Sequence, residues 1–282
     1  MTTYGVIGCG YVGSDVAVRM KYAGHHVVGT TRSSARLDEL SGVVHEAHQL
    51  DLTAPDANLD FLERLDGVLI SVAPTQQGEG YNSVFEHGIA TLSRALRCRQ
   101  NTKPLHVTLI SSAGVYGDQQ GKAVDEESAL DTSNPVNGLL ASSEERILSV
   151  DRPDTTICVL RLGGIYGQGR DMAAMIERAA GHQVPKNGNA IPARSSILDI
   201  TQGVEFAFSK QLDGIYNLVD DRQLSRRDLS TVICDREGLP PVLWGHQEPA
   251  DSRRLNARVS NRKIKTAGFR LSSPSMLDQA LV

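Results

Sequence analysis

Short apolar runs alternate with longer amphipathic stretches over the first 160 residues of the chain. Runs typical of buried strands cover residues 3–7, 26–30, 67–72, 105–111 and 156–162. Stretches of helical periodicity cover residues 12–22, 34–40, 82–98 and 142–150. Strands interleaved with helices favour right-handed crossovers and a parallel sheet covered on both faces. The pattern therefore predicts an α/β protein with a doubly wound parallel sheet.

The composition and the predicted helix lengths change after residue 163. Glycine and proline become more frequent and the helical stretches become shorter. A pattern typical of a core returns at residues 196–209 and 214–219. We therefore expect two lobes that interleave in sequence, namely a Rossmann lobe and a smaller C-terminal substrate lobe. The predicted boundaries are 1–163 plus 196–219 for the first and 164–195 plus 220–282 for the second.

Composition narrows the class of protein. The 282 residues are 40% apolar and 22% charged, with a formal net charge of −4, as in ordinary globular proteins. We expect no nucleic-acid partner. The four cysteines form no C-x-x-C pair and have no histidine at metal-ligand spacing, which predicts neither disulfides nor a metal site and favours a reducing cytoplasm. No apolar stretch approaches the roughly 20 residues of a membrane span, so we expect no membrane partner.

A glycine-rich turn is the first motif that indicates chemistry. It follows the first predicted strand, opens the first predicted helix, and reads Gly8-Cys9-Gly10-Tyr11-Val12-Gly13. Gly8 permits a tight turn, Gly10 lets a pyrophosphate approach the backbone, and Gly13 lets helix and strand pack closely. The helix N-terminus offers unpaired N–H groups to phosphates. The motif predicts a bound dinucleotide; the alternative is a glycine-rich turn without a ligand.

The end of the second strand bears on which dinucleotide binds. It reads Thr31-Arg32-Ser33 and has no acidic residue to hold a ribose 2′-hydroxyl. The Arg32 guanidinium can bond a 2′-phosphate through two hydrogen bonds. We therefore expect NADP in preference to NAD, with an exposed loop arginine as the alternative.

Two further strand ends are predicted to line the cofactor crevice. Asp51 and Leu52 follow the third strand, where they could flank an adenine ring. The small residues Val72, Ala73 and Pro74 end the fourth strand. Small side chains suit the carboxyl ends of parallel strands, where backbone lines a crevice.

Four segments together resemble the extended branch of the short-chain dehydrogenase/reductase superfamily, the NAD-dependent epimerases and dehydratases. The residues that carry the likeness lie at 111–118 (SSAGVYGD), 161–169 (RLGGIYGQG), 197–200 (ILDI) and 216–217 (YN). The resemblance implies a nicotinamide cofactor and a small-molecule substrate, in that branch largely a nucleotide sugar. It also implies that Ser112 bonds the reacting hydroxyl or carbonyl, while Ser111, Gly164 and Ile165 contact the cofactor.

The chain departs from the family at the catalytic pair. Family members carry Y-x-x-x-K, in which the tyrosine is the general acid or base and the lysine lowers its pKa. Asn137 and Ala141 occupy those positions here, and none of the seven tyrosines has a lysine four residues later. Ile7 also stands where the branch usually has the first glycine of G-x-x-G-x-x-G. The usual proton relay is therefore absent.

Two functions remain open at this point. One is an oxidoreductase or epimerase in which Ser112 polarises the substrate and Tyr116 or Tyr81 moves the proton, unless Tyr116 is a packed aromatic residue. The other is a non-catalytic NADP sensor that signals to a partner.

The predicted substrate lobe holds five residues that could meet a sugar phosphate. They are His182, Lys186, Arg194, Arg222 and Trp244, and each could instead be a surface or packing residue. A homodimer is predicted through the helices at 82–98 and from 142.

Overall fold

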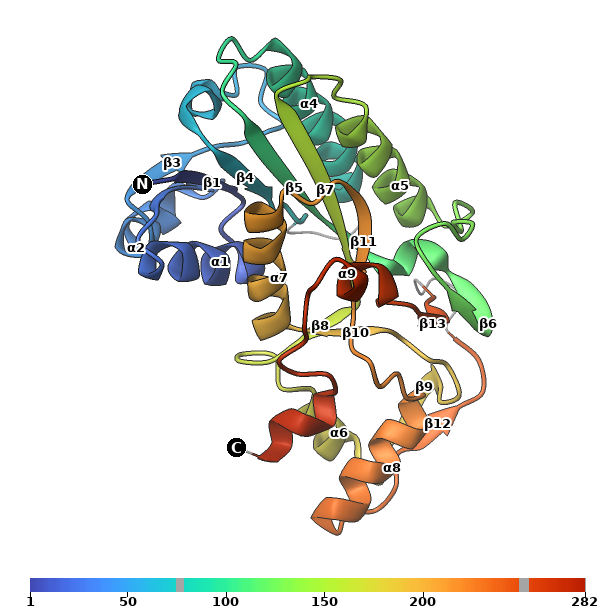
Figure 1. Cartoon of the computed structure of the whole chain (residues 1–282). Coiled ribbons are helices and arrows are strands. Elements are labelled where there is room, and N and C mark those ends of the chain that lie inside the picture. Colours follow the sequence, from blue (N-terminus) through green and yellow to red (C-terminus); the bar gives the residue numbers. More distant parts are fainter. Residues whose placement is uncertain (75–78, 249–253, 282) are drawn as a thin grey trace. The chain divides into compact units, whose positions relative to one another are not determined.

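The computed structural model describes residues 1–74, 79–248 and 254–281 (Figure 1). Contacts divide the chain into two compact units that interleave in sequence. The first contains Met1–Ser111, Gly138–Leu160 and Thr201–Ile215, and the second contains Ser112–Asn137, Arg161–Ile200 and Tyr216–Val282. The predicted lobes differ in giving residues 112–137, 161–163, 196–200 and 216–219 to the first lobe. That the first lobe binds the cofactor and the second the substrate stays a prediction.

A seven-stranded sheet runs in the order β11-β7-β5-β4-β1-β2-β3. Its strands are β1 (Thr3–Ile7), β2 (His26–Thr31), β3 (Glu46–Gln49), β4 (Gly67–Ile70), β5 (Leu105–Ser112), β7 (Thr155–Leu162) and β11 (Gly214–Leu218). β1 pairs in parallel with β2 and β4, and β4 pairs in parallel with β5. The chain thus steps outward from β1 to β3, crosses back to β4, and continues to the other edge. This order confirms the predicted doubly wound α/β fold.

Helices cover both faces of the sheet in the first unit (Figure 1). They are α1 (Tyr11–Tyr22), α2 (Leu37–Val43), α3 (Glu79–Asn82), α4 (Ile89–Cys98), α5 (Pro135–Leu148) and α7 (Ile197–Lys210). α4 and α5 lie side by side, because Ser93 Oγ donates to the Arg146 carbonyl at 3.2 Å. Helices on both faces bury β4 completely, which explains its unbroken apolar run.

Two predicted helices have different bounds in the structure. α5 begins at Pro135 rather than at 142, since proline suits the first helical position and the Asn134 side chain accepts from the Val136 N–H at 3.0 Å. The predicted helix at 82–98 is divided, because a π-helical segment at Ser83–Gly88 separates α3 from α4.

The second unit is built from short elements around its own apolar cluster. Its strands are β6 (Asp118–Val124), β8 (Gly164–Tyr166), β9 (Gln183–Asn187), β10 (Arg194–Ser196), β12 (Leu243–Gly245) and β13 (Asn256–Val259). Its helices are α6 (Met172–Ala179), α8 (Arg226–Glu237) and α9 (Arg262–Thr266). The cluster includes Tyr166, Ile176, Leu229, Ile233 and Val242. α6 and α8 therefore pack through one common apolar core.

The described residues include neither a membrane-spanning helix nor a cluster of metal-ligating side chains. No helix within the described ranges is both long and apolar enough to cross a bilayer. Among the same residues, no group of three or more His, Cys, Asp or Glu side chains could hold a metal ion.

Candidate functional site

The glycine-rich turn has the geometry that its three glycines require. Gly8 follows β1 with φ +92°, and a Cβ there would lie 2.7 Å from the Ser71 carbonyl oxygen. A Cβ on Gly13 would collide with the carbonyl oxygen of Gly8. A Cβ on Gly10 would meet no atom of a described residue within 4 Å. Packing fixes two glycines, whereas the third faces open space.

Hydrogen bonds to β2 hold this turn in place. The Cys9 N–H donates to the Thr30 carbonyl at 2.8 Å, and the Gly8 N–H donates to the Thr30 hydroxyl at 3.0 Å. Burial raises the pKa of the Cys9 thiol to about 11, so the thiol stays neutral. α1 starts after Gly10, and no side chain in the described part of the chain caps it. Its start, at Tyr11 and Val12, is a place where an anion can accept from backbone N–H groups.

The ends of β2 and β3 bring Arg32 and Asp51 to one edge of the sheet. Thr31 is buried at the end of β2, whereas Arg32 and Ser33 are exposed. The Thr53 hydroxyl donates to the Asp51 carboxylate at 2.7 Å and lowers its pKa, and Arg32 lowers it further through its charge. The predicted residues at both strand ends therefore lie close enough to interact.

The remaining predicted cofactor contacts of this unit differ in exposure. Val72 lies beside the turn, since its Cα would be 3.2 Å from a Cβ on Gly8. Ala73 is exposed and Pro74 is partly buried. Leu52 is buried next to Gly88: a Cβ added to Gly88 would lie 3.2 Å from the Leu52 Cβ. Leu52 is thus a packing residue as well as a candidate cofactor contact.

Ser111 forms a hydrogen bond with a buried carboxylate that sequence reasoning missed. Its hydroxyl donates to the Glu144 carboxylate, and both side chains are buried. Glu144 lies on α5, seven residues after Asn137 and three after Ala141. Residues at these spacings share one face of a helix, so Glu144 lies on the same face as the two positions where the family has Tyr and Lys. No signal in the sequence could have found this pair, because no local pattern indicates that Glu144 faces β5.

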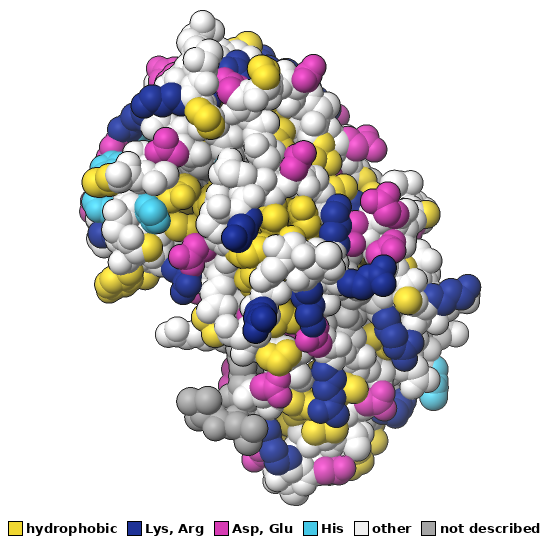
Figure 2. Space-filling model, in the orientation of Figure 1, with side chains coloured by type: hydrophobic (Ala, Val, Ile, Leu, Met, Phe, Trp, Pro, Cys, Tyr) yellow, Lys and Arg dark blue, Asp and Glu magenta, His cyan; other side chains and the backbone are white. Residues whose placement is uncertain are grey.

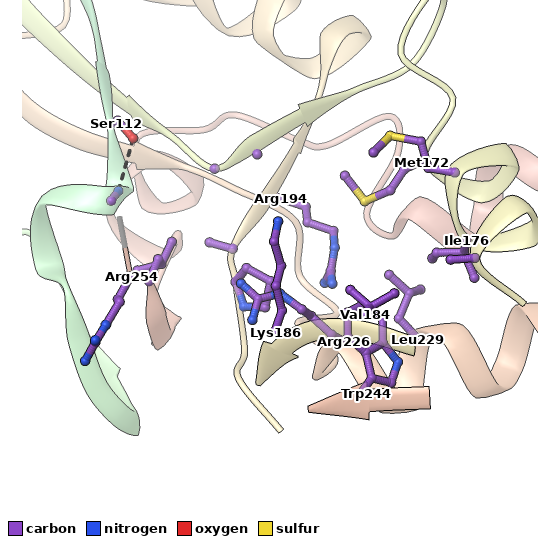
Figure 3. A pocket seen from close by; sticks show the side chains of 18 of the residues that line it. Ser112, Met172, Ile176, Val184, Lys186, Arg194, Arg226, Leu229, Trp244 and Arg254 are labelled. Atoms are coloured by element: carbon purple, nitrogen blue, oxygen red, sulfur yellow. Dashed lines mark hydrogen bonds between the residues drawn. The ribbon is translucent and has the colours of Figure 1, made fainter. Parts of the chain in front are cut away.

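A cavity of about 470 Å³ lies within the second unit (Figure 3). One part of its wall is apolar and includes Met172, Met175, Ile176, Val184, Leu229 and Trp244. Another part carries the cations Lys186, Arg194, Arg226 and Arg254. The cavity thus combines an apolar wall with four positive charges.

Three of the five polar or aromatic residues proposed for the substrate lobe line this cavity. Lys186, Arg194 and Trp244 do so, whereas His182 and Arg222 are exposed and are not among its lining residues. Sequence reasoning missed the methionines of α6 and Arg226, which have no distinguishing motif.

Ser112 lies on the cavity wall at the end of β5. Its Oγ accepts from the Gly114 N–H at 3.1 Å and so caps the turn Ala113–Tyr116. The hydroxyl proton donates to no described residue, so it remains available to an oxygen in the cavity. Gly164 also lines the cavity, whereas Ile165 is not among its lining residues.

Tyr116 lies in the core, away from the cavity wall. Its hydroxyl donates to Asn217 Oδ1 at 2.8 Å and accepts from an Arg161 guanidinium N–H at 2.9 Å. The side chain has no exposed surface, and burial raises its pKa. This environment favours the packing role, which the sequence left open as the alternative to catalysis. Tyr81 packs its ring on Phe85 in the first unit, with centroids 5.8 Å apart.

Arg194 is the most buried of the cavity cations, with 6% of its surface exposed. It donates to the Leu224 carbonyl at 3.1 Å, and no described carboxylate forms an ion pair with it. Burial lowers its pKa to about 10, so it remains charged at neutral pH. Arg226 by contrast pairs with Glu248. Arg194 therefore brings to the cavity a positive charge without an ion-pair partner among the described residues.

The family model for the NAD dependent epimerase/dehydratase family matches residues 6–218. The chain belongs to this family. The match includes the glycine turn, Ser112 and nearly the whole of the seven-stranded sheet, which agrees with the predicted resemblance.

Solved structures share the fold over nearly the whole chain. A candidate NAD-dependent epimerase/dehydratase from Methylobacillus flagellatus is 25% identical, with a TM-score of 0.76, covering 98% of this chain and 95% of that one. A functionally unknown conserved protein from Silicibacter pomeroyi is 24% identical, with a TM-score of 0.75 over the same shares. The UDP-glucose 4-epimerase of Thermus thermophilus, solved with NAD, is 18% identical, with a TM-score of 0.77 over 96% and 94%. No curated protein sequence matches the chain at a significant level.

Proposed function

We propose that this family member is an NAD(P)-dependent oxidoreductase or epimerase that acts on a hydroxyl or carbonyl group of an anionic small molecule. The observation that carries the proposal is the glycine turn: Gly8 and Gly13 are fixed by packing while Gly10 leaves open space before the start of α1. Family members of the same fold have been solved with NAD, which supports a nicotinamide cofactor here.

The residues present fit a dinucleotide. The backbone N–H at Val12 would hold the pyrophosphate, because a phosphate needs N–H donors. Gly10, whose own N–H donates to the Gly8 carbonyl at 2.8 Å, would contribute room for the phosphate through the absence of a Cβ. A bound nicotinamide supplies a hydride acceptor for a hydroxyl or a hydride donor for a carbonyl. Val72 and Ser111 are proposed to border the cofactor, as are Gly164 and Ile165.

NADP is the proposed preference. Arg32 is exposed at the end of β2, near enough to Asp51 to lower its pKa. A guanidinium can bond a 2′-phosphate twice, whereas Asp51, the acid that follows β3, already accepts from Thr53. The solved relatives contain NAD, so this preference would be particular to chains with a basic strand end.

Ser112 is the proposed catalytic donor. Its free proton faces the cavity, where it can bond the reacting oxygen. Among the described lining residues, Lys186 supplies the one ammonium group, which can donate hydrogen bonds to a substrate oxygen beside Ser112, since the rest are arginines, apolar side chains and glycines. We propose that Ser112 and Lys186 take the place of the Tyr/Lys pair that most of the family uses.

A nucleotide sugar is the first candidate substrate. The relatives MoeE5 and the Thermotoga maritima epimerase were solved with UDP-glucuronic acid and UDP-glucose. Arg194 and Arg226 would then hold the pyrophosphate, because a buried guanidinium bonds phosphate oxygens strongly. A small carbonyl compound with a carboxylate or phosphate is the second candidate.

The test begins with binding of NADPH and NADH to the purified protein, followed by turnover of nucleotide sugars and of small carbonyl acids. We expect binding of both cofactors and oxidation of NADPH by at least one substrate. Ser112→Ala should reduce turnover at least about 100-fold, whereas Ser133→Ala, at an exposed serine of the same unit, should not. Cofactor binding without turnover of any compound would favour the sensor. Failure of both cofactors to bind would refute the proposal.

The cofactor preference has its own test. Arg32→Ala should weaken NADPH by about 10- to 150-fold, the value of one charge-assisted bond, and leave NADH nearly unchanged. Arg36→Ala is the matched control, since Arg36 is exposed and pairs with Glu39 at 3.3 Å. Equal losses for both cofactors in Arg32→Ala would refute a 2′-phosphate contact.

A further inference from the structure

We infer that the substrate carries an apolar body, alkyl or aromatic, behind its anionic group, in place of a sugar ring. This inference rests on the proposed function in taking the cavity of the second unit as the substrate site. It concerns a choice that the proposed function leaves open, between a nucleotide sugar and a smaller, less polar acid.

The described cavity wall carries few neutral hydrogen-bonding side chains. Among the described lining residues there is no carboxylate and no carboxamide, and Ser112 supplies the one hydroxyl. The Trp244 indole N–H is already bonded to Ser230 Oγ at 2.9 Å. Buried hydroxyl groups that find no partner lower affinity, because they lose their hydrogen bonds to water. A sugar ring with several hydroxyls would be poorly matched here.

The apolar wall itself also supports an apolar substrate body (Figure 3). Met172 and Ile176 of α6 face Val184, Leu229 and Trp244 across the same space. These side chains are the open side of the apolar cluster that holds α6 and α8 together. Flexible thioethers and an indole ring adapt well to alkyl and aromatic groups.

Exposure of Met175 strengthens this argument. It lines the cavity with 59% of its surface exposed. Exposed apolar side chains that line a concave surface are typical of ligand sites.

The other side of the cavity carries positive charge. On the outer surface, several cations pair with acidic neighbours, as Lys265 does with Asp221 at 2.9 Å, and Figure 2 shows acidic and basic side chains on the same face. Arg194 has no such ion pair with a described residue and is buried at the cavity wall. The charge of the buried Asp220 raises the pKa of Arg194, but the two side chains form no ion pair. Buried charges are usually paired, so a ligand anion is the partner that would contact Arg194 directly.

Tryptophan fluorescence reports on this site, because Trp244 is the single tryptophan of the sequence. The full-length protein is titrated with butanoate, hexanoate and octanoate, with octyl phosphate, and with UDP-glucose. We expect affinity to rise by up to about fourfold for each added methylene. Titrations with octyl phosphate and octanoate show which anionic group binds more tightly. Octan-1-ol, which has the same chain without an anionic group, should bind at least about tenfold more weakly than the better of the two. UDP-glucose should cause no saturable change.

Two variants test whether the dependence of affinity on chain length comes from the apolar wall of the cavity. Met175→Ser should reduce the gain per methylene, and its exposed position keeps the fold intact. Val232→Ser is the matched control, since Val232 is also exposed, lies on α8, and does not line the cavity. Circular dichroism verifies that both variants are folded. An equal effect of the two substitutions would overturn the inference.

The outcomes separate this inference from the proposed function. Saturable quenching by UDP-glucose without a response to the acids would overturn the apolar substrate and leave an NAD(P)-dependent enzyme standing. No response to any of these ligands would also overturn it. Binding of the acids with the predicted chain-length dependence, in a protein that binds neither NADPH nor NADH, would support the apolar site and refute the proposed function.

Discussion

The two units present their candidate sites in different ways. The first unit forms a turn whose shape depends on backbone, with Gly8, Gly10 and Gly13 as residues that lack a side chain. The second unit forms a cavity from side chains, apolar on one part of the wall and cationic on another. A backbone site needs a short contiguous motif, whereas a side-chain site draws residues from several elements. This difference decides which of the two can be recognised in a sequence.

The two candidate sites also differ in charge. The glycine turn contains no charged residue, so its affinity for phosphate would come from N–H groups and the helix start. The second unit buries Arg194, Asp199 and Asp220. Asp199 accepts from the Ser272 N–H at 2.6 Å, and burial raises the pKa of Asp220 to about 7. The two carboxylates hold short elements of the unit together, whereas Arg194 also lines its cavity.

The strongest test of the backbone site compares three glycines. Gly13→Ala should destabilise the fold by about 2–3 kcal/mol through its collision with Gly8, and should reduce NADPH affinity at least about 100-fold. Gly10→Ala should leave stability within about 0.5 kcal/mol yet reduce NADPH affinity at least about tenfold. Gly42→Ala is the control, since Gly42 lies in α2 with open space around it. Calorimetry and thermal melts measure both effects; normal NADPH binding by Gly10→Ala would remove the turn from the cofactor site.

The side-chain site should respond to loss of its buried charge. Arg194→Met should weaken an anionic ligand of the cavity by about 10- to 150-fold. Stability should change by less than about 1 kcal/mol, because an apolar side chain replaces a buried charge without an ion pair. Arg227→Met is the control, since Arg227 lies on α8 outside the cavity lining. A large loss of stability without loss of ligand affinity would show that Arg194 is structural.

The sheet of the first unit should be sensitive to acid through His106. Burial lowers its pKa from 6.5 to about 4, so the folded state favours the neutral imidazole. This stabilisation is fully present above pH 6.5 and is lost as the pH falls toward 4, with about 2 kcal/mol lost by pH 5. His106→Gln should reduce the difference in unfolding free energy between pH 7.5 and pH 5 by that amount, as measured in urea. His87→Gln, which removes an exposed imidazole, should leave the difference as in the wild type.

The smallest expected effect concerns Tyr116. Tyr116→Phe removes the hydroxyl that bonds Asn217 and Arg161, which should cost about 1–2 kcal/mol of stability. Turnover should stay within about twofold of the wild type, whereas a proton-transfer role would predict a loss of about 100-fold or more. Steady-state kinetics beside urea unfolding distinguishes the two roles.

Most of the sheet could be predicted, and the reason is local. β1, β5 and β7 are apolar runs followed by glycine or ending in serine, and the structure has them within one residue of the prediction. The start of α5 was predicted too late, because apolar periodicity is weak there, although Pro135 and the Asn134 cap were visible signals. The two lobes that interleave in sequence were also expected from the return of a core pattern near residue 196.

What the sequence by itself determined was the doubly wound fold, the family and the glycine turn, since each depends on residues close together in the chain. Only the tertiary structure decided that Ser111 bonds Glu144, that Tyr116 is buried, and that Arg194 faces a cavity with Met172 and Trp244. These contacts join residues tens of positions apart. Their energies depend on burial and geometry, which no local pattern of the sequence records.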